Sequence, residues 1–256
     1  TTEIYTLSLH DALPIFKASW LDEEKNTVAD ANGNWKIYLS TPAASFDPRT
    51  IQIASDGDTL KLNGVLIGQV WLCSGQSNMA FALDRECNAA TEIPKADYPF
   101  IRLYQGKNIS SAEPLSDVQG QWQACTPDTV SKFSAVGYYF GKELFQKINK
   151  PVGLINFSWG GTPVETWMSP QGLAQFDKYT KYLNDYWASQ SMKYAQSKKK
   201  YDADLAQWQK DIKAGKDTKK PASPRGLRLQ DKPYYCYNGM IAPIKGFAIA
   251  GVIWYQ

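Results

Sequence analysis

The ten residues Val70–Met79 constrain the fold more than any other stretch of the chain. The first four are apolar, as in a strand that is buried on both faces of a sheet. They lead into Gly75-Gln76-Ser77-Asn78, where glycine permits a tight turn just beyond the strand. Ligands of open α/β sheets bind outside the carboxyl ends of the strands, so a serine here is placed as an activated nucleophile among backbone N–H groups. The alternative is a loop that only caps the next helix.

The segments that follow alternate between strand and helix patterns. Residues 100–104 and 151–157 have the apolar composition of buried strands. Between them, residues 133–145 carry an apolar side chain at every fourth position, which predicts an amphipathic helix. A strand–helix–strand order of this kind predicts a parallel sheet with right-handed crossovers, and therefore an α/β fold.

A second glycine turn follows the strand at residues 151–157. Gly160 and Gly161 allow the backbone to approach a ligand closely, and they suit a nest of N–H groups. Thr162 is placed to cap a following helix, with Pro163 at its first position and Glu165 at the capping-box position. A plain strand-to-helix turn is the alternative interpretation.

Residues 17–66 have a β pattern instead. Turn residues at 30–33 precede alternating segments at 35–39, 51–53 and 60–62. Short strands at this spacing predict part of a β-sandwich.

The first 16 residues fit neither pattern. Residues 7–15 resemble translated adapter sequence, so we expect residues 1–16 to be a non-native stub. This stub contains His10, the only histidine of the chain, which we expect to be incidental to any chemistry.

Charge and hydropathy argue against several classes of partner. Residues 170–220 form a lysine-rich, helical insertion, but aspartates at 202, 204 and 211 interrupt its basic residues, as in an ordinary solvated helix. The net charge of +3 is too small to indicate nucleic acid or an anionic membrane surface. No apolar run reaches the roughly 18 residues of a transmembrane helix. We therefore expect neither nucleic acid nor a membrane as partner.

The four cysteines show no metal-ligand spacing, so we expect no metal and no cofactor. Cys73 lies in the apolar run and is expected to be a small buried hydrophobe. A disulfide between Cys87 and either Cys125 or Cys236 stays open from the sequence.

Three stretches resemble the motif blocks of SGNH-type hydrolases, in particular the sialate O-acetylesterase and carbohydrate acetylesterase branch. Gly-Gln-Ser-Asn-Met at 75–79 stands where the wider superfamily has Gly-Asp-Ser, and residues 158–167 look like the second block. Asn-Gly-Met-Ile-Ala-Pro at 238–243 is followed by a strand and Trp-Tyr-Gln at 254–256, which resembles the third. The resemblance implies a three-layer α/β/α, flavodoxin-like core with a parallel sheet over residues 67–256, preceded by the partial β-sandwich.

The resemblance also implies a role for each site residue. Ser77 would be the nucleophile. The oxyanion hole would use the N–H groups of Ser77 and Gly161, with Gly160 as the alternate for Gly161, and the side-chain amide of Gln256. The residues expected to contact the substrate are Gln76, Asn78, Trp159 and Glu165.

The implied reaction removes acetyl groups from a carbohydrate through an acyl-enzyme. Acyl transfer by serine needs a general base, and the family takes it from a C-terminal Asp-x-x-His block. No histidine follows Ser77, and the chain stops within the third block. We therefore expect a nearly inactive fragment of an esterase whose relatives commonly work outside the cytoplasm, in extracellular or periplasmic locations.

Two other functions stay open. A non-catalytic carbohydrate-binding protein with an esterase-like fold would keep the cleft tryptophans 71, 159, 167 and 254 without a base. A lipase or phospholipase of the same superfamily fits less well, because no apolar lid segment follows the motif. The sugar itself is left open between sialic acid, xylan and other acetylated glycans.

Overall fold

A computed structural model describes residues 2–4, 15–55 and 57–256. His10 and most of the expected stub lie outside the described residues. Contacts divide the chain into two units. The first comprises Thr1–Asn108, Leu115–Thr162 and Met240–Gln256, and the second comprises Ile109–Pro114 and Pro163–Gly239.

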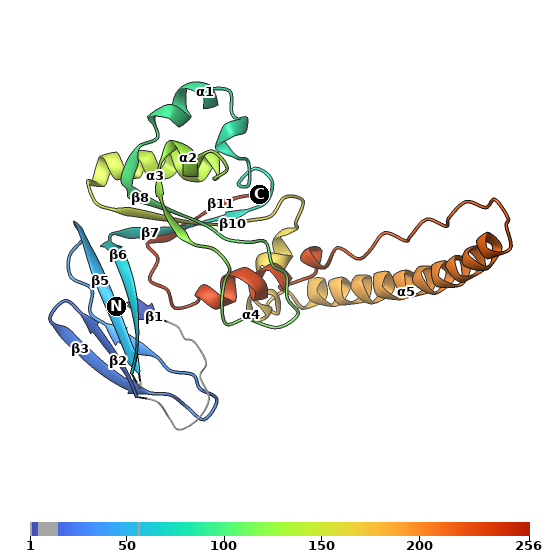
Figure 1. The fold of residues 1–256 in the computed structure, drawn as a ribbon, viewed down its shortest axis with the longest axis horizontal. Helices are drawn as coiled ribbons and strands as arrows, with labels where there is room; N and C mark the ends of the chain where they lie inside the picture. Colours follow the sequence, from blue (N-terminus) through green and yellow to red (C-terminus); the bar gives the residue numbers. More distant parts are fainter. Residues whose placement is uncertain (1, 5–14, 56) are drawn as a thin grey trace. The chain divides into compact units, whose positions relative to one another are not determined.

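A five-stranded mixed sheet forms the centre of the first unit. Its strands lie in the order β11 (Gly251–Tyr255), β7 (Gln69–Gly75), β10 (Val152–Ser158), β8 (Tyr98–Gln105) and β9 (Trp122–Cys125). The first four strands are parallel, and only β9 runs antiparallel to its neighbour (Figure 1). The α/β class with parallel strands is therefore as the sequence predicts.

The strand order differs from the flavodoxin-like order that the resemblance implies. In the flavodoxin order the second strand pairs with the first. Here β8, the second parallel strand of the chain, pairs with β10, and β11 takes the place beside β7. All seven residues of β10 are buried, whereas β8 carries Arg102 and Gln105. The wholly buried strand therefore occupies the central position, and β8 lies outside it.

Helix α3 (Ala135–Ile148) packs on this sheet close to where the sequence predicts a helix. The Ser134 hydroxyl caps its start by accepting a bond of 3.0 Å from the N–H of Gly137. Gly141 allows close approach, because a Cβ there would lie 2.5 Å from a methyl group of Leu154 on β10. Shorter helical segments follow β7 and β9: η1 (Leu83–Arg85), α1 (Ala89–Glu92), η2 (Ile93–Lys95) and α2 (Pro127–Val130).

The β region of the first unit consists of two sheets. An antiparallel sheet has the order β3 (Glu23–Val28), β2 (Ile15–Trp20), β5 (Ser45–Ser55) and β6 (Asp58–Ile67), and β1 (Thr2–Ile4) pairs with β4 (Ile37–Leu39). Ile37 and Leu39 of β4 pack into one core with Phe16 and Trp20 of β2. The two sheets therefore share a single hydrophobic core.

The second unit is mainly helical. It contains η3 (Val164–Trp167), α4 (Pro170–Leu173), α5 (Asp177–Lys213) and η4 (Leu229–Asp231), with the π-helical turn η5 (Tyr237–Ile241) crossing back into the first unit, where η6 (Ala242–Ile244) follows. Leu183 is the buried residue of α5, and two lysine–aspartate pairs, four residues apart, bridge its exposed surface. This is the solvated helix that the sequence predicts for the insertion. No helix in the described ranges has both the length and the apolar character needed to cross a bilayer.

All four cysteines are free thiols. Cys87 is exposed, whereas Cys73, Cys125 and Cys236 are buried, and burial raises the pKa of each buried thiol to about 12. The disulfide left open by the sequence is not formed, and Cys73 is the buried hydrophobe that its strand pattern predicts.

Candidate active site

The carboxyl end of β7 requires a glycine. Gly75 has a φ of +138°, and a Cβ there would lie 2.1 Å from the carbonyl oxygen of Tyr255. That carbonyl accepts a bond of 3.1 Å from the N–H of Gln76, and the Gly75 carbonyl accepts one of 3.1 Å from the N–H of Trp159. The turns after β7 and β10 are thereby held together at one edge of the sheet.

Ser77 is exposed at this edge, two residues beyond the strand. Met79, just after it, is completely buried, and its sulfur accepts a bond of 3.4 Å from the hydroxyl of Ser134. A buried anchor on one side and the Gly75 turn on the other hold the serine in the exposed position that the sequence predicts.

Three donors from the two turns converge on one oxygen, the Oε1 atom of Gln76. The N–H of Ser77 lies 3.0 Å from it, the Ser77 hydroxyl 2.8 Å and the N–H of Gly161 3.1 Å. Gly161 adopts a φ of +77°, which favours glycine and turns its N–H toward this oxygen. Residues 85 positions apart in the chain therefore form a single pocket of donors.

Gly160 lies directly against the serine. A Cβ at this glycine would lie 3.4 Å from the Cβ of Ser77. Any side chain here would narrow the approach to the hydroxyl. The structure therefore brings together the serine and the two glycines that the sequence selects.

Gln256 and Asn78 are linked beside this pocket. The side-chain nitrogen of Asn78 donates to the carbonyl of Gln256 at 3.1 Å. The side-chain nitrogen of Gln256 donates to the carbonyl of Thr162 at 3.0 Å, and so is directed at the second turn rather than at Oε1 of Gln76. The amide of Gln256 thus ties the third motif stretch to the second.

The expected capping role of Thr162 is wrong. Its hydroxyl donates back to the carbonyl of Trp159 at 2.7 Å, and η3 begins after Pro163 without a side-chain cap. The threonine closes the glycine turn on itself instead of starting a helix. Trp159, expected to contact substrate, is half-buried.

Glu165 lies in the second unit, on η3. One carboxylate oxygen accepts a hydrogen bond from the hydroxyl of Tyr179. The other oxygen is buried and has no hydrogen-bond partner among the residues that the structure describes. Its expected contact with substrate stays a prediction.

A chain of hydrogen bonds from buried Ser158 and Asn156 to exposed Gln105 supports the end of β10, and the motif pattern did not predict it. The hydroxyl of Ser158 donates to Asn156 at 2.8 Å, and the amide of Asn156 donates to Gln105 on β8 at 2.9 Å. The signal was an asparagine within an otherwise apolar strand, because buried amides are costly unless they are paired. These bonds fix the spacing of β10 and β8 just below the second glycine turn.

Comparison with known proteins identifies the family to which this chain belongs. A family model described as carbohydrate esterase, sialic acid-specific acetylesterase matches residues 67–213. The chain belongs to this family. The matched residues include both glycine turns and Ser77.

Several relatives carry the same description in their names. Sialate O-acetylesterase of Rattus norvegicus is 26% identical over 249 residues, which are 90% of this chain and 43% of that protein. The Homo sapiens sialate O-acetylesterase is 39% identical over 151 residues, 54% of this chain and 29% of that protein. The crystal structure of a carbohydrate acetylesterase from Xanthomonas citri superposes with a TM-score of 0.73 at 26% identity, covering 99% of this chain and 46% of that chain. The chain thus spans less than half the length of these family members.

No group of three or more His, Cys, Asp or Glu side chains within the described ranges is arranged to hold a metal ion.

Proposed function

We propose that this chain carries the nucleophile and two oxyanion donors of a serine esterase that removes O-acetyl groups from carbohydrates. Membership of the carbohydrate esterase family supports the ester and sugar classes. The observation that carries the proposal is the convergence of three donors on Oε1 of Gln76. In the proposal, the oxygen of a bound acetyl group takes the place of this amide oxygen and accepts the bonds from the two N–H groups, while the Ser77 hydroxyl faces the acetyl carbon.

In the proposed reaction, the hydroxyl oxygen of Ser77 attacks the acetyl carbonyl and gives its proton to a general base. The carbonyl oxygen becomes negative and accepts hydrogen bonds from the N–H groups of Ser77 and Gly161. Losing one such donor typically costs about 3–4 kcal/mol of transition-state stabilisation. Collapse releases the sugar hydroxyl, which takes a proton from the conjugate acid of the base, and leaves acetyl-Ser77. Water then repeats the sequence and releases acetate.

Gln76 must move before this reaction begins. Its amide oxygen occupies the donor pocket and also accepts the proton of the nucleophile at 2.8 Å. We infer that substrate displaces the amide, after which the side chains of Gln76, Asn78, Trp159 and Glu165 contact the sugar. Rotation of the Gln256 side-chain amide away from Thr162 would supply a third donor to the acetyl oxygen. The N–H of Gly160 is the alternate for the N–H of Gly161.

The base is the missing component. The only histidine is His10, and none follows Ser77. A serine hydroxyl is a weak nucleophile without an adjacent base. We propose that the chain alone turns over slowly and that the full esterase places a histidine beside Ser77, on a three-layer α/β/α core at residues 67–256 that follows the β-sandwich module at residues 17–66.

Imidazole added in solution can substitute for the missing base, and this tests the proposal. Acetate release from an O-acetylated sialic acid should be slow for this chain and should rise with imidazole concentration. The matched Ser77→Ala variant should show neither the basal nor the imidazole-dependent release. Equal release by both proteins would refute the esterase site.

The alternative function, a non-catalytic carbohydrate-binding protein, is favoured by the absence of the base. It predicts that both proteins bind the acetylated sugar with equal affinity and that imidazole restores no Ser77-dependent release.

A further inference from the structure

A second pocket lies in the first unit, away from Ser77. Its volume is about 740 Å³, within the usual range for small-molecule sites. It is enclosed by β5 and β6 of the β region and by the amino-terminal halves of β7 and β10. Val70 on β7 lines it, and Gly75 is five steps of about 3.3 Å further along the strand, so the pocket lies roughly 16 Å from the candidate active site.

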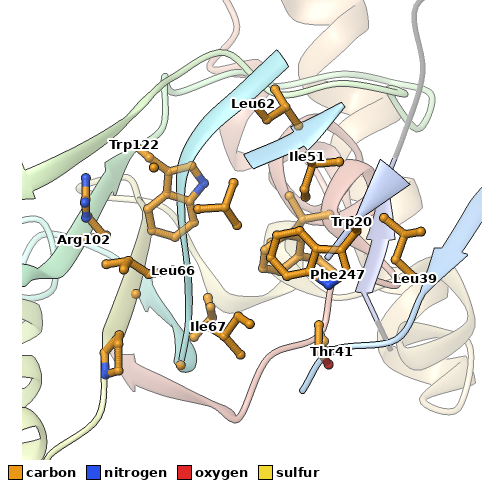
Figure 2. Close-up of a pocket in the computed structure, with 18 of the residues that line it drawn as sticks. Trp20, Leu39, Thr41, Ile51, Leu62, Leu66, Ile67, Arg102, Trp122 and Phe247 are labelled. Atoms are coloured by element: carbon orange, nitrogen blue, oxygen red, sulfur yellow. The ribbon is translucent and has the colours of Figure 1, made fainter. Parts of the chain in front are cut away.

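The walls of this pocket are mostly apolar and include three large aromatic rings. Trp122 lies over Gly153, whose missing side chain leaves room for the indole; a Cβ there would lie 3.2 Å from it. Trp20 and Phe247 line another part of the pocket with Ile51 (Figure 2). Flat rings on separate walls of a cavity this size suit a flat apolar ligand.

Arg102 of β8 lines this apolar pocket without a charged neighbour in the sheet. Its partners in register are Gly153 on β10 and Ala124 on β9, neither of which can pair with a guanidinium. Its Nε atom is buried and has no hydrogen-bond partner among the residues that the structure describes. Figure 2 shows the side chain near Trp122. A buried donor on a cation is costly unless an anion pairs with it.

The remaining charged residues of the lining leave an excess of positive charge. Lys61 and Arg102 are cationic, and Asp117 is the acidic residue of the lining. One carboxylate oxygen of Asp117 already accepts the N–H of Val118 at 2.7 Å. An incoming monoanion would therefore meet one net positive charge.

We propose that this pocket binds an amphipathic monoanion: a flat apolar ring system with one carboxylate. The ring lies among Trp20, Trp122 and Phe247, and the carboxylate pairs with the guanidinium of Arg102. Planar guanidinium and carboxylate groups form short, charge-assisted hydrogen bonds in such geometry. The site is independent of the esterase proposal, because it shares no residue with the donor pocket around Ser77.

Calorimetric titration with 2-naphthoate and its uncharged isostere 2-naphthamide tests this site on the chain as it is. Naphthoate should bind about tenfold or more tightly than naphthamide, because only the acid forms the charge-assisted pair. Arg102→Gln keeps most of the side-chain bulk and should make the two affinities nearly equal. Leu62→Trp fills the pocket from a partly exposed position on β6 and should weaken both ligands.

Ser77→Ala should leave all these affinities unchanged, which separates the pocket from the active site. Thermal unfolding of each variant checks that it is folded. The proposal is overturned if naphthoate fails to bind the parent chain, if it binds no more tightly than naphthamide, or if its advantage survives in Arg102→Gln.

Discussion

The two ends of the five-stranded sheet differ although the same strands, β7 and β10, supply both. At the carboxyl end, Gly75 and Gly161 bring backbone N–H groups around an exposed serine. At the amino end, Gly153 leaves space that Trp122 and the apolar pocket occupy. Glycine therefore serves different purposes on one sheet: at one end it allows the turn that directs an N–H group to the oxygen of Gln76, and at the other it leaves room for an indole beside an apolar pocket.

The difference follows from strand direction. Parallel strands present their chain turns, with free N–H groups, outside their carboxyl ends. Beside their amino ends, other elements line the pocket. Here these elements belong to the β region, which contributes Trp20 and Ile51. The proposed acyl transfer and the proposed ring binding are thus assigned to opposite ends of the strands, and we expect that each can be perturbed without the other.

The largest expected effect comes from a side chain at the carboxyl end. Gly75→Ala would place a Cβ 2.1 Å from the backbone oxygen of Tyr255 at a φ of +138°, so neither atom can yield without moving β11. We expect a loss of about 3 kcal/mol or more in the free energy of unfolding. Denaturant unfolding monitored by tryptophan fluorescence measures it.

Gly153→Ala is the matched change at the amino end. Its Cβ would contact a methyl group of Val70 at 3.1 Å, a side chain that can shift, and we expect a loss of about 1 kcal/mol or less. Gly226→Ala, with no atom within 4 Å, is the control and should be close to neutral. Equal losses for Gly75→Ala and Gly153→Ala would remove the distinction between the ends.

A change in the helical layer should lower stability without altering either end of the sheet. Glu92 and Lys142 form a largely buried ion pair beside α3, and Glu92 also accepts the hydroxyl of Tyr138 at 2.7 Å. We expect Glu92→Gln to lower the free energy of unfolding by about 1–2 kcal/mol near neutral pH. Neither the amide resonance of Gly161 nor naphthoate binding should change in this variant.

The pH dependence of that loss has a defined sign. The hydrogen bond from Lys142 lowers the pKa of Glu92 below its usual 4.5, so the pair stabilises the fold above that value. The difference between parent and Glu92→Gln should therefore shrink as the pH falls through the lowered pKa. Glu143→Gln, which removes an exposed pair with Lys147, is the control and should cost about 0.5 kcal/mol or less.

Removing the amide of Gln76 tests the carboxyl end with little effect on stability. In Gln76→Ala the N–H of Gly161 loses its acceptor at 3.1 Å, so its proton resonance should move upfield in an NMR spectrum. The indole resonance of Trp122 at the amino end should not move. An unchanged Gly161 resonance would show that the amide does not occupy the donor pocket in solution.

Thiol labelling tests the sheet between its two ends and requires no substitution. The exposed Cys87 should react quickly with a thiol reagent, because the reagent can reach its sulfur. Cys73, Cys125 and Cys236 have a pKa of about 12 through burial and should react only on unfolding. Fast labelling of Cys73, which lies within β7, would mean that the sheet opens between its two ends.

Much of this arrangement follows from the sequence pattern. Apolar runs that end in glycine predicted β7, β10 and their turns, and with them the exposed position of Ser77 near Gly161. These features are local, or follow from the rule that parallel strands end at one edge.

Other features depend on contacts that the pattern does not contain. The strand order depends on which strand is best buried, so the flavodoxin-like order was wrong for β8. The side-chain oxygen of Gln76 accepts a bond from Gly161, which is far away in the chain. The hydroxyl of Thr162 donates to the carbonyl of Trp159 and caps no helix. In the sequence, Arg102 is only a polar residue within a strand. Its position in a pocket depends on the β region, which supplies other residues of the lining.

Mass spectrometry of the chain after brief exposure to 4-nitrophenyl acetate tests the central claim most directly. Without a base to assist hydrolysis, the acyl-enzyme should persist, so the account predicts one acetyl group on the peptide that contains Ser77, and none on that peptide in Ser77→Ala. Acetylation confined to lysines, with Ser77 unmodified, would contradict the account.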